Sequence, residues 1–376
     1  MIASFTIHNY RSILEATLNF RYPHARACRN RDVREIYPFF QVKTKEETAR
    51  LLPCLGIWGP NGSGKSNLFR ALRLFQEVIL NGQTLPLPRL YEPNRLVAGP
   101  RPTRFELQAY LPYKRKIHNV IYRLTYDETR ILDETLTCDG TSYLSRENLG
   151  PCELALSHCK APWINILRQH FCIIDVWSMT GNGYGKHIFA LAQQLHEDPT
   201  LFIEKVSAIV ARLDVGIHKL ELLTAPDAPP LVVTYHTNTL GEEVCFDINE
   251  ESDGTQRILF LVAELLAALT KGQTIIADEM DRSIHPILFR TLIRMCKSKA
   301  YNHGKGQICF STHDLSLMEA STIAPEEVVL VGKRGVETRI ETLSSLVPGR
   351  SSAYLFKRFR ERYLEGWYQN IPYPSL

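Results

Sequence analysis

The segment Gly59 to Ser66, which reads GPNGSGKS, has the residue types and spacing that bind phosphate. It fits the pattern GxxxxGK[ST], follows an apolar stretch that ends at Trp58, and precedes a helix predicted over 65–80. Glycines let backbone N–H groups turn toward phosphate oxygens, and the helix N-terminus adds its positive dipole end. Lys65 is expected to reach the β- and γ-phosphates, and the Ser66 hydroxyl to ligate Mg²⁺.

A glycine-rich turn before a helix is the alternative, and the other motifs of the chain weigh against it. The expected nucleotide contacts of this segment are Asn61, Gly62, Ser63, Gly64, Lys65, Ser66 and Asn67.

Two adjacent carboxylates, Asp278 and Glu279, end an apolar strand predicted over 273–278. An NTPase with a phosphate loop needs an aspartate that holds Mg²⁺ and a group that positions or deprotonates the attacking water. Neighbouring residues of a strand face opposite ways, so we assign Asp278 to the metal and Glu279 to the water. A solvated strand end followed by a helix cap is the alternative.

Two weaker motifs lie on either side of this strand. Ser252 and Gly254 form a small polar turn before a helix predicted over 255–270, a place that suits either phosphate or ordinary N-capping. Taken alone, the turn is better explained by capping. His313 follows a strand predicted over 307–311. A lone histidine is usually structural, but this strand should lie beside the acidic one, near the γ-phosphate.

The elements that must position these motifs alternate between strands and helices, which predicts a mostly parallel sheet covered by helices. Residues 2–7 and 13–20 read as two strands joined at Asn9-Tyr10-Arg11-Ser12, and residues 150–225 as largely helical. The remaining expected elements are strands at 51–58, 104–111, 118–126, 130–137, 231–236, 243–248 and 327–331, and a helix at 284–299.

Composition narrows the class of protein. With 44% hydrophobic and 22% charged residues among 376, the chain should fold, and no run of 18 apolar residues occurs, which argues against a transmembrane bundle. The first residues do not form a signal peptide, and nine cysteines without CxxC pairs fit a reduced, cytoplasmic chain. Zinc binding by Cys152, Cys159, His170 and Cys172 is conceivable, but their spacing matches no common zinc site and core cysteines are the better interpretation.

The net charge of +4 is too small for a protein that coats nucleic acid, yet it is unevenly distributed. Residues 1–50 hold nine Lys and Arg against five Asp and Glu, which equals the whole excess. We therefore expect the irregular segment 21–50 to be an insertion with a surface for a partner or for nucleic acid.

The order of the motifs resembles the head of an ABC-type ATPase: phosphate loop, signature turn, acidic strand, Asp281, then histidine. The resemblance implies that Ser252 and Gly254 cover the ATP of a second head, that Asp281 is a nucleotide-site residue, and that Glu279 and His313 are catalytic. The signature usually reads close to LSGGQ, whereas here it reads Ser252-Asp-Gly-Thr-Gln256. Gln108 is the candidate for the family's Q-loop glutamine.

A closer resemblance covers residues 1 to about 373. Asn9-Tyr-Arg-Ser12 is similar to the NFRS turn of RecF- and SMC-like heads, which implies that Arg11 approaches the nucleotide phosphates. Five other segments resemble the AbiL-like group of prokaryotic AAA/ABC-type ATPases. These segments are Leu213–Ile217, Glu251–Thr255, Asp278–Pro286, Ser311–Asp314 and Arg362–Pro372. The chain departs from that group's pattern at Trp367, Gln369 and Asn370 in the tail, and at Pro325-Glu326, where an Arg-Asp pair is common.

The resemblance implies an α/β fold: an ABC-type P-loop ATPase head with a mostly parallel sheet, an antiparallel β subdomain and a helical insertion. We expect an N-terminal ATPase lobe over 1–149, a mainly helical insertion over 150–230 and a C-terminal ATPase lobe over 231–376.

The function implied is ATP hydrolysis with ATP and Mg²⁺, in a homo-oligomer of at least two heads. The group includes subunits of phage-defence systems such as Septu and PARIS, where a separate nuclease or toxin is the effector. A RecF/SMC-like ATPase of DNA repair or DNA-end processing is the alternative, with possible nucleic-acid contact but without the long heptad arm of that class. A non-hydrolysing ATP-binding scaffold is a third reading, disfavoured by the intact Asp278-Glu279 pair.

Overall fold

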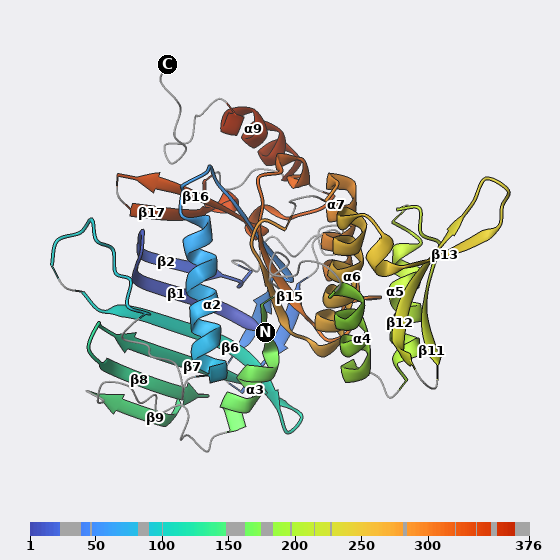
Figure 1. Cartoon of the computed structure of the whole chain (residues 1–376). Helices are drawn as coiled ribbons and strands as arrows, with labels where there is room; N and C mark the ends of the chain where they lie inside the picture. The colour runs from blue at the N-terminus through green and yellow to red at the C-terminus, as the bar shows by residue number, and fades with distance from the viewer. Residues whose placement is uncertain are drawn as a thin grey trace.

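The computed structural model describes residues 1–22, 39–45, 47–81, 90–99, 101–147, 162–173, 183–195, 198–213, 215–225, 228–280, 284–319, 321–335, 337–346 and 352–364. Within these residues, two six-stranded sheets build the molecule, one antiparallel and one mainly parallel (Figure 1). A three-stranded sheet and a two-stranded hairpin are added to them.

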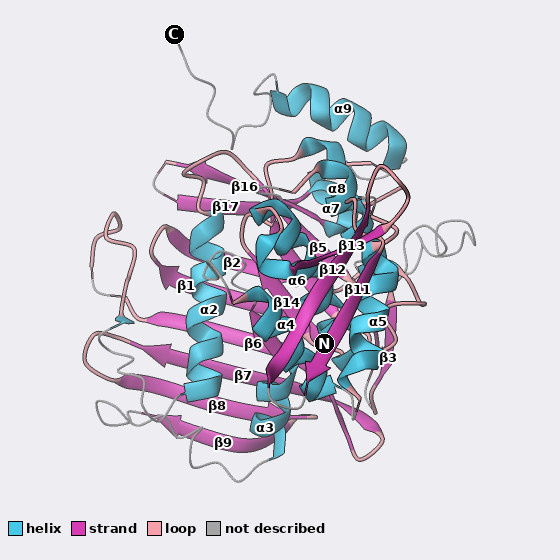
Figure 2. Cartoon of the chain, turned by 45° about the vertical axis from the view of Figure 1, so that its right-hand side comes forward, coloured by secondary structure: helices cyan, strands magenta, loops and turns pink. Residues whose placement is uncertain are grey.

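The antiparallel sheet comes from the first 147 residues. Its order is β2 (Ile13–Asn19), β1 (Ile2–Tyr10), β6 (Thr103–Tyr113), β7 (Lys116–Tyr126), β8 (Ile131–Cys138) and β9 (Thr141–Glu147). Buried and more exposed residues alternate along these strands, as expected when one face packs on a core. That face packs on α2 (Lys65–Asn81), which lies across the sheet in both views (Figures 1 and 2). Phe75 of α2 contacts the rings of Phe5, Phe105 and Tyr122.

The parallel sheet carries the motifs. Its order is β10 (Phe171–Ile173), β14 (Thr274–Ala277), β15 (Gln307–Ser311), β5 (Cys54–Trp58), β16 (Val328–Arg334) and β17 (Glu337–Thr342), and only β17 runs antiparallel to its neighbour. Every residue of β14, β15 and β5 is buried, which explains why their central residues are apolar. Because β14, β15 and β5 are parallel, their carboxyl ends meet at one edge of the sheet.

Helices of the C-terminal part cover this sheet. α6 (Asp253–Lys271) is buried along most of its length and contacts α4 (Tyr184–Leu195), α5 (Pro199–Val210) and α7 (Pro286–Lys297). The three-stranded sheet β11 (Lys219–Ala225), β12 (Ala228–Thr237) and β13 (Glu243–Asp247) packs on α5 at the side of the molecule (Figure 1). The remaining described strands and α-helices are β3 (Phe40–Lys43), β4 (Thr48–Leu51), α3 (Pro162–His170), α8 (Leu343–Leu346) and α9 (Ser352–Leu364).

Most predicted elements are confirmed, and a few differ. The strand expected over 51–58 is the shorter β5, because Pro53 lacks an N–H donor and stands just before it, while Leu51 ends β4. The short strands β9 and β17 were not predicted, and the segment 21–50, expected to be irregular, contains β3 and most of β4. The segment 150–230 contains α3, α4 and α5 but also β10 and β11. Its status as a helical insertion between lobes 1–149 and 231–376 stays a prediction. Among the described helices, none has the length and apolar character needed to cross a membrane.

Candidate functional site

The phosphate loop joins β5 to α2, as its sequence predicts. Gly64 has φ +110°, and a Cβ there would lie 2.2 Å from Thr338 Oγ1, so glycine is required by both conformation and space. Gly62 has φ +76° with open space around it. The conformation of the loop therefore depends on glycine at these two positions.

Lys65 lies at the first position of α2 and is largely buried. Its Nζ donates to the carbonyl oxygens of Gly59 at 2.7 Å and Pro60 at 3.0 Å. The buried Ser63 Oγ has no hydrogen-bond partner among the described residues. An unsatisfied hydroxyl at Ser63 and a Lys65 ammonium bonded to carbonyls of its own loop fit a loop that binds phosphate oxygens.

Asp278 and Glu279 follow β14 and are half-buried at the same edge. The neighbouring strand β15 supplies Ser311, whose hydroxyl donates to Asp278 Oδ1 and accepts from the Glu279 amide at 2.7 Å. Glu279 has φ +48°, which is unusual for a residue with a side chain and is typical of constrained functional sites. A single buried hydroxyl thus fixes the backbone and one carboxylate of the acidic pair.

His313 lies two residues beyond β15, which is bonded to β14 on one side and to β5 on the other. The prediction that its strand lies beside the acidic strand is confirmed. Its side chain is exposed at the edge where the phosphate loop and the acidic pair are also found. Thr312 N donates to Ile57 O at 3.1 Å, which fixes this turn next to the end of β5.

A network of hydroxyl and amide groups attaches two distant segments to the phosphate loop. Ser12 Oγ accepts from Asn67 Nδ2 at 2.8 Å and lies 2.7 Å from Thr338 Oγ1. Thr338 Oγ1 donates to Ser63 O at 3.1 Å, and its amide donates to Ser12 O at 2.8 Å. The turn after β1 and the strand β17 therefore support the loop from outside.

Arg11 lies in that turn with φ +51°, but its guanidinium is paired with Glu92. Nε and Nη2 donate to the two carboxylate oxygens at 2.8 and 2.6 Å, and the Arg11 amide donates to Glu92 O at 2.7 Å. The hydrogen bond to Glu92 raises the pKa of Arg11. A nucleotide contact by Arg11 stays a prediction, and such a contact would have to compete with this bidentate pair.

The signature turn precedes α6, where Ser252 is the N-cap and accepts from Thr255 N at 3.2 Å. Ser252 is exposed and Gly254 half-buried, and neither is hydrogen-bonded to the phosphate loop in the described part of the chain. Glu251, just before the turn, accepts from Thr234 and His236 of β12. The turn is thus capped, held by the three-stranded sheet and open to solvent, which suits contact with a second molecule.

Several sequence predictions have other outcomes. Gln108 is wrong as the Q-loop glutamine, because it lies in the middle of β6 opposite Ser4 and donates to Asn119 Oδ1 at 2.9 Å. Since the phosphate loop adjoins the other end of β1, this position is remote from it. Asp281, Asp214 and the tail from residue 365 lie outside the described residues.

Most of the residues considered above as zinc ligands lie outside the described part of the chain. Cys152 and Cys159 lie outside it, as does the side chain of Cys172. His170 Nδ1 lies 3.2 Å from Gly272 O, and burial lowers its pKa to about 4.

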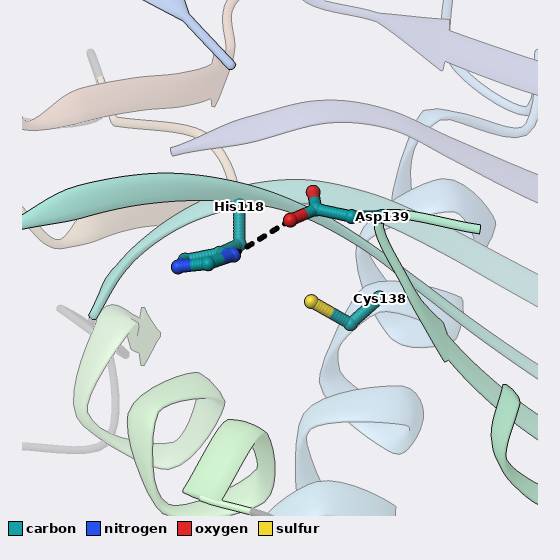
Figure 3. A group of neighbouring side chains, drawn as sticks. All are labelled: His118, Cys138 and Asp139. Carbon is teal, nitrogen blue, oxygen red and sulfur yellow. Dashed lines mark hydrogen bonds and ion pairs between the residues drawn. The ribbon is translucent and has the colours of Figure 1, made fainter. Parts of the chain in front are cut away.

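A different group of possible ligands, His118, Cys138 and Asp139, lies at one end of the antiparallel sheet (Figure 3). His118 Nδ1 is 2.7 Å from Asp139 Oδ2. Burial, with the nearby Asp139, raises the pKa of the Cys138 thiol to about 12, and a protonated thiol is a poor metal ligand.

Sequence reasoning assigned no role to Ser311, Thr338 or Glu92. Ser311 is the one that the sequence could have revealed, since it stands at the end of β15 at the level of Asp278. Thr338 reaches the site through the pairing of β17 with β16, and Glu92 through a turn. No local sequence pattern predicts either placement.

Comparisons with known proteins agree with this architecture. A family described as "AAA domain, putative AbiEii toxin, Type IV TA system" matches residues 184–319. An Smc head bound to the C-winged helix domain of ScpA is similar in structure, with 14% identity and a TM-score of 0.57 over 92% of this chain and 98% of that one. A search among curated proteins gave no match.

Two further Smc heads are similar. One, from Pyrococcus yayanosii, has a coiled coil and joint, with 9% identity and a TM-score of 0.56 over 96% of this chain and 99% of that one. The other, from Pyrococcus furiosus and bound to the C-terminal domain of ScpA, has 12% identity and a TM-score of 0.52 over the same shares. The protein therefore has the fold of an ABC-type ATPase head, similar in structure to SMC heads, and residues 184–319 are similar to the family described as an AAA domain.

Proposed function

We propose that the protein hydrolyses ATP with Mg²⁺ at the edge formed by β5, β15 and β14. The observation that carries the proposal is the convergence there of the phosphate loop with the Asp278–Ser311–Glu279 cluster. Lys65 and the loop amides would hold the β- and γ-phosphates, and Ser66 and Asp278 would hold the ion. Bound Mg²⁺ would neutralise charge that develops on the phosphates.

The remaining side chains act on the attacking water. Glu279 is proposed to orient it or accept its proton, and His313 to contact the γ-phosphate. Arg11, Asn67 and Asp281 complete the contacts on the same chain. The exposed turn of Ser252 and Gly254 would close over the ATP of a second head, so the active unit is at least a homodimer.

Two variants test this assignment. Lys65→Ala should abolish ATP binding, whereas Glu279→Gln should retain ATP, lose hydrolysis and accumulate as a dimer on size-exclusion chromatography. Glu204→Gln, at an exposed position of α5, is the matched control. Undiminished turnover in Glu279→Gln would reject the role of Glu279, and unchanged ATP affinity in Lys65→Ala would reject the site itself.

We further propose that this ATPase is a cytoplasmic subunit of a prokaryotic antiphage defence system and that it controls a separate nuclease or toxin. The motifs of the AbiL-like group and the match to an AbiEii-type domain description support this reading. Co-purification with the product of an adjacent nuclease gene, released or activated when Glu279→Gln traps ATP, would support it. An adjacent recombination operon would contradict it.

A DNA-repair or DNA-end-processing role is the second candidate, because the fold likeness is to SMC heads. Salt-dependent binding of DNA ends, with ATP turnover stimulated by those ends, would favour it. Failure to bind DNA at low salt would reject it.

A further inference from the structure

A cavity of about 530 Å³ lies at the end of the antiparallel sheet that is remote from the phosphate loop. Three hairpins line it: those between β3 and β4, between β6 and β7, and, through Asp139, between β8 and β9. Its lining residues are Gln41, Lys43, Thr44, Lys45, Arg115, Lys116, Ile117, His118 and Asp139. A cavity of this size can hold a ligand as large as a nucleotide.

The cavity is separate from the ATP site. Met1, at the start of β1, is hydrogen-bonded to Tyr110 near this end, whereas Ser12, just beyond the end of β1, contacts the phosphate loop. The nine residues of β1 span roughly 25–30 Å at the usual strand rise. A ligand in the cavity therefore cannot contact Lys65 or Asp278.

Four cationic side chains, Lys43, Lys45, Arg115 and Lys116, line the cavity and are exposed. Within the described part of the chain, none of the four has a side-chain hydrogen bond or ion pair. The lining carboxylate, Asp139, already accepts from the Asn119 amide at 2.9 Å and contacts His118. The positive charge of the cavity is therefore not neutralised by these neighbours.

The described carboxylate of the β3–β4 turn is also engaged elsewhere. Glu47, at the end of the β3–β4 turn, is paired with Arg21 at 3.2 Å and accepts from the Tyr110 hydroxyl. The bond to Arg21 lowers the pKa of Glu47, so its charge is directed away from the cavity cations. Like charges so concentrated repel one another unless an anion enters.

The turn between β6 and β7 gives an independent indication. Its two central residues, Lys114 and Arg115, both have positive φ, of +46° and +63°. A two-residue hairpin of this kind strongly prefers Asn-Gly, because side chains are strained in this conformation. Strain of this kind is found at functional sites. Here the turn holds Arg115 at the cavity and Lys114 over the Tyr113 ring, 5.2 Å from its centroid.

We propose that this cavity binds a ligand with several phosphate groups. Lys43 and Lys45 contact it from one hairpin and Arg115 and Lys116 from another, while the His118 ring, tilted against the Trp163 ring with centroids 4.8 Å apart, forms part of the wall. Free oligophosphates or nucleotides and the backbone of a nucleic-acid strand present the same groups. The test distinguishes these sources.

The experiment measures binding to the full chain by equilibrium dialysis without Mg²⁺, in the Lys65→Ala background that silences the ATP site. The probes are inorganic tripolyphosphate, AMP and a 12-nucleotide oligothymidylate. The first cavity variant, Lys114→Asn/Arg115→Gly, installs the preferred turn. The second, Lys43→Gln/Lys45→Gln, removes the cations of the β3–β4 hairpin. The control, Lys299→Ala/Lys357→Ala, removes two exposed charges elsewhere.

We expect tripolyphosphate affinity to fall at least tenfold in each cavity variant and to be unchanged in the control. The Asn-Gly variant should also melt at a higher temperature, so lost binding cannot be ascribed to unfolding. When Lys65 is left unchanged, both cavity variants should keep their ATPase activity. Loss of tripolyphosphate binding can then be distinguished from failure of the proposed ATPase function. Binding of the oligonucleotide alone, lost in both cavity variants, supports the site and identifies nucleic acid as the source. Equal affinities in cavity and control variants, or no binding of any probe, overturn the proposal.

Discussion

The buried hydroxyl of Ser311 offers the sharpest test of how the acidic pair is held. Ser311→Ala removes the bond to Asp278 and leaves the Glu279 amide without its acceptor. A bond between neutral groups contributes about 1 kcal/mol, and one to a carboxylate about 1.5–3 kcal/mol. The two bonds together contribute about 2.5–4 kcal/mol, and if about half of this is expressed in the transition state, roughly 1.25–2 kcal/mol, kcat falls by about 8–30-fold.

The assay is steady-state ATP turnover at varied ATP and Mg²⁺. Ser311 contacts the acidic pair and not the phosphate loop, so the KM for ATP should change little. The Mg²⁺ concentration for half-maximal rate should rise, because Asp278 loses an orienting partner. Ser311→Thr keeps the hydroxyl and should recover part of the rate. Ser345→Ala, which removes an exposed hydroxyl bonded to Thr342 O, is the control. An unchanged kcat and Mg²⁺ dependence in Ser311→Ala would refute this reasoning.

Three other predictions follow from the structure. Gly64→Ala should lose ATP binding because its Cβ meets Thr338, whereas Gly62→Ala should lose less because space is open there; equal ATP affinities by calorimetry would contradict this. Glu327→Gln leaves Lys297 buried without its anion and should destabilise the fold by about 3–5 kcal/mol in urea unfolding, against no more than about 0.5 kcal/mol for the exposed control Glu204→Gln. His170 is neutral in the folded state with a pKa of about 4, so the unfolded chain binds its proton first and stability should fall between about pH 6.5 and 4. His170→Gln should flatten that slope and the exposed His303→Gln should not, as pH-dependent unfolding can check.

The sequence predicted the parts of the fold where each element has a strong local pattern. The phosphate loop, the acidic strand and the strand before His313 could be placed side by side because parallel strands share a carboxyl edge. The assignment of Gln108 to the Q-loop was wrong, because the sequence around a glutamine in an alternating strand does not show whether it binds a ligand or a residue of the neighbouring strand. The Asn67–Ser12–Thr338 support could not be predicted, because its side chains are small, ordinary and up to 326 residues apart. The Arg11–Glu92 pair likewise depends on a turn that only the folded chain reveals.

The position of β5 in the parallel sheet has a consequence for synthesis of the chain. β5 ends at residue 58, yet its two neighbours, β15 and β16, begin at residues 307 and 328. At translation rates of about 5–20 residues per second, both edges of this apolar strand wait roughly 12–50 s for their partners. The antiparallel sheet, complete by residue 147, can fold on the ribosome within that interval. During this time the nascent chain exposes an unpaired, wholly apolar strand, and chaperones that bind such edges should associate with it until the last third emerges.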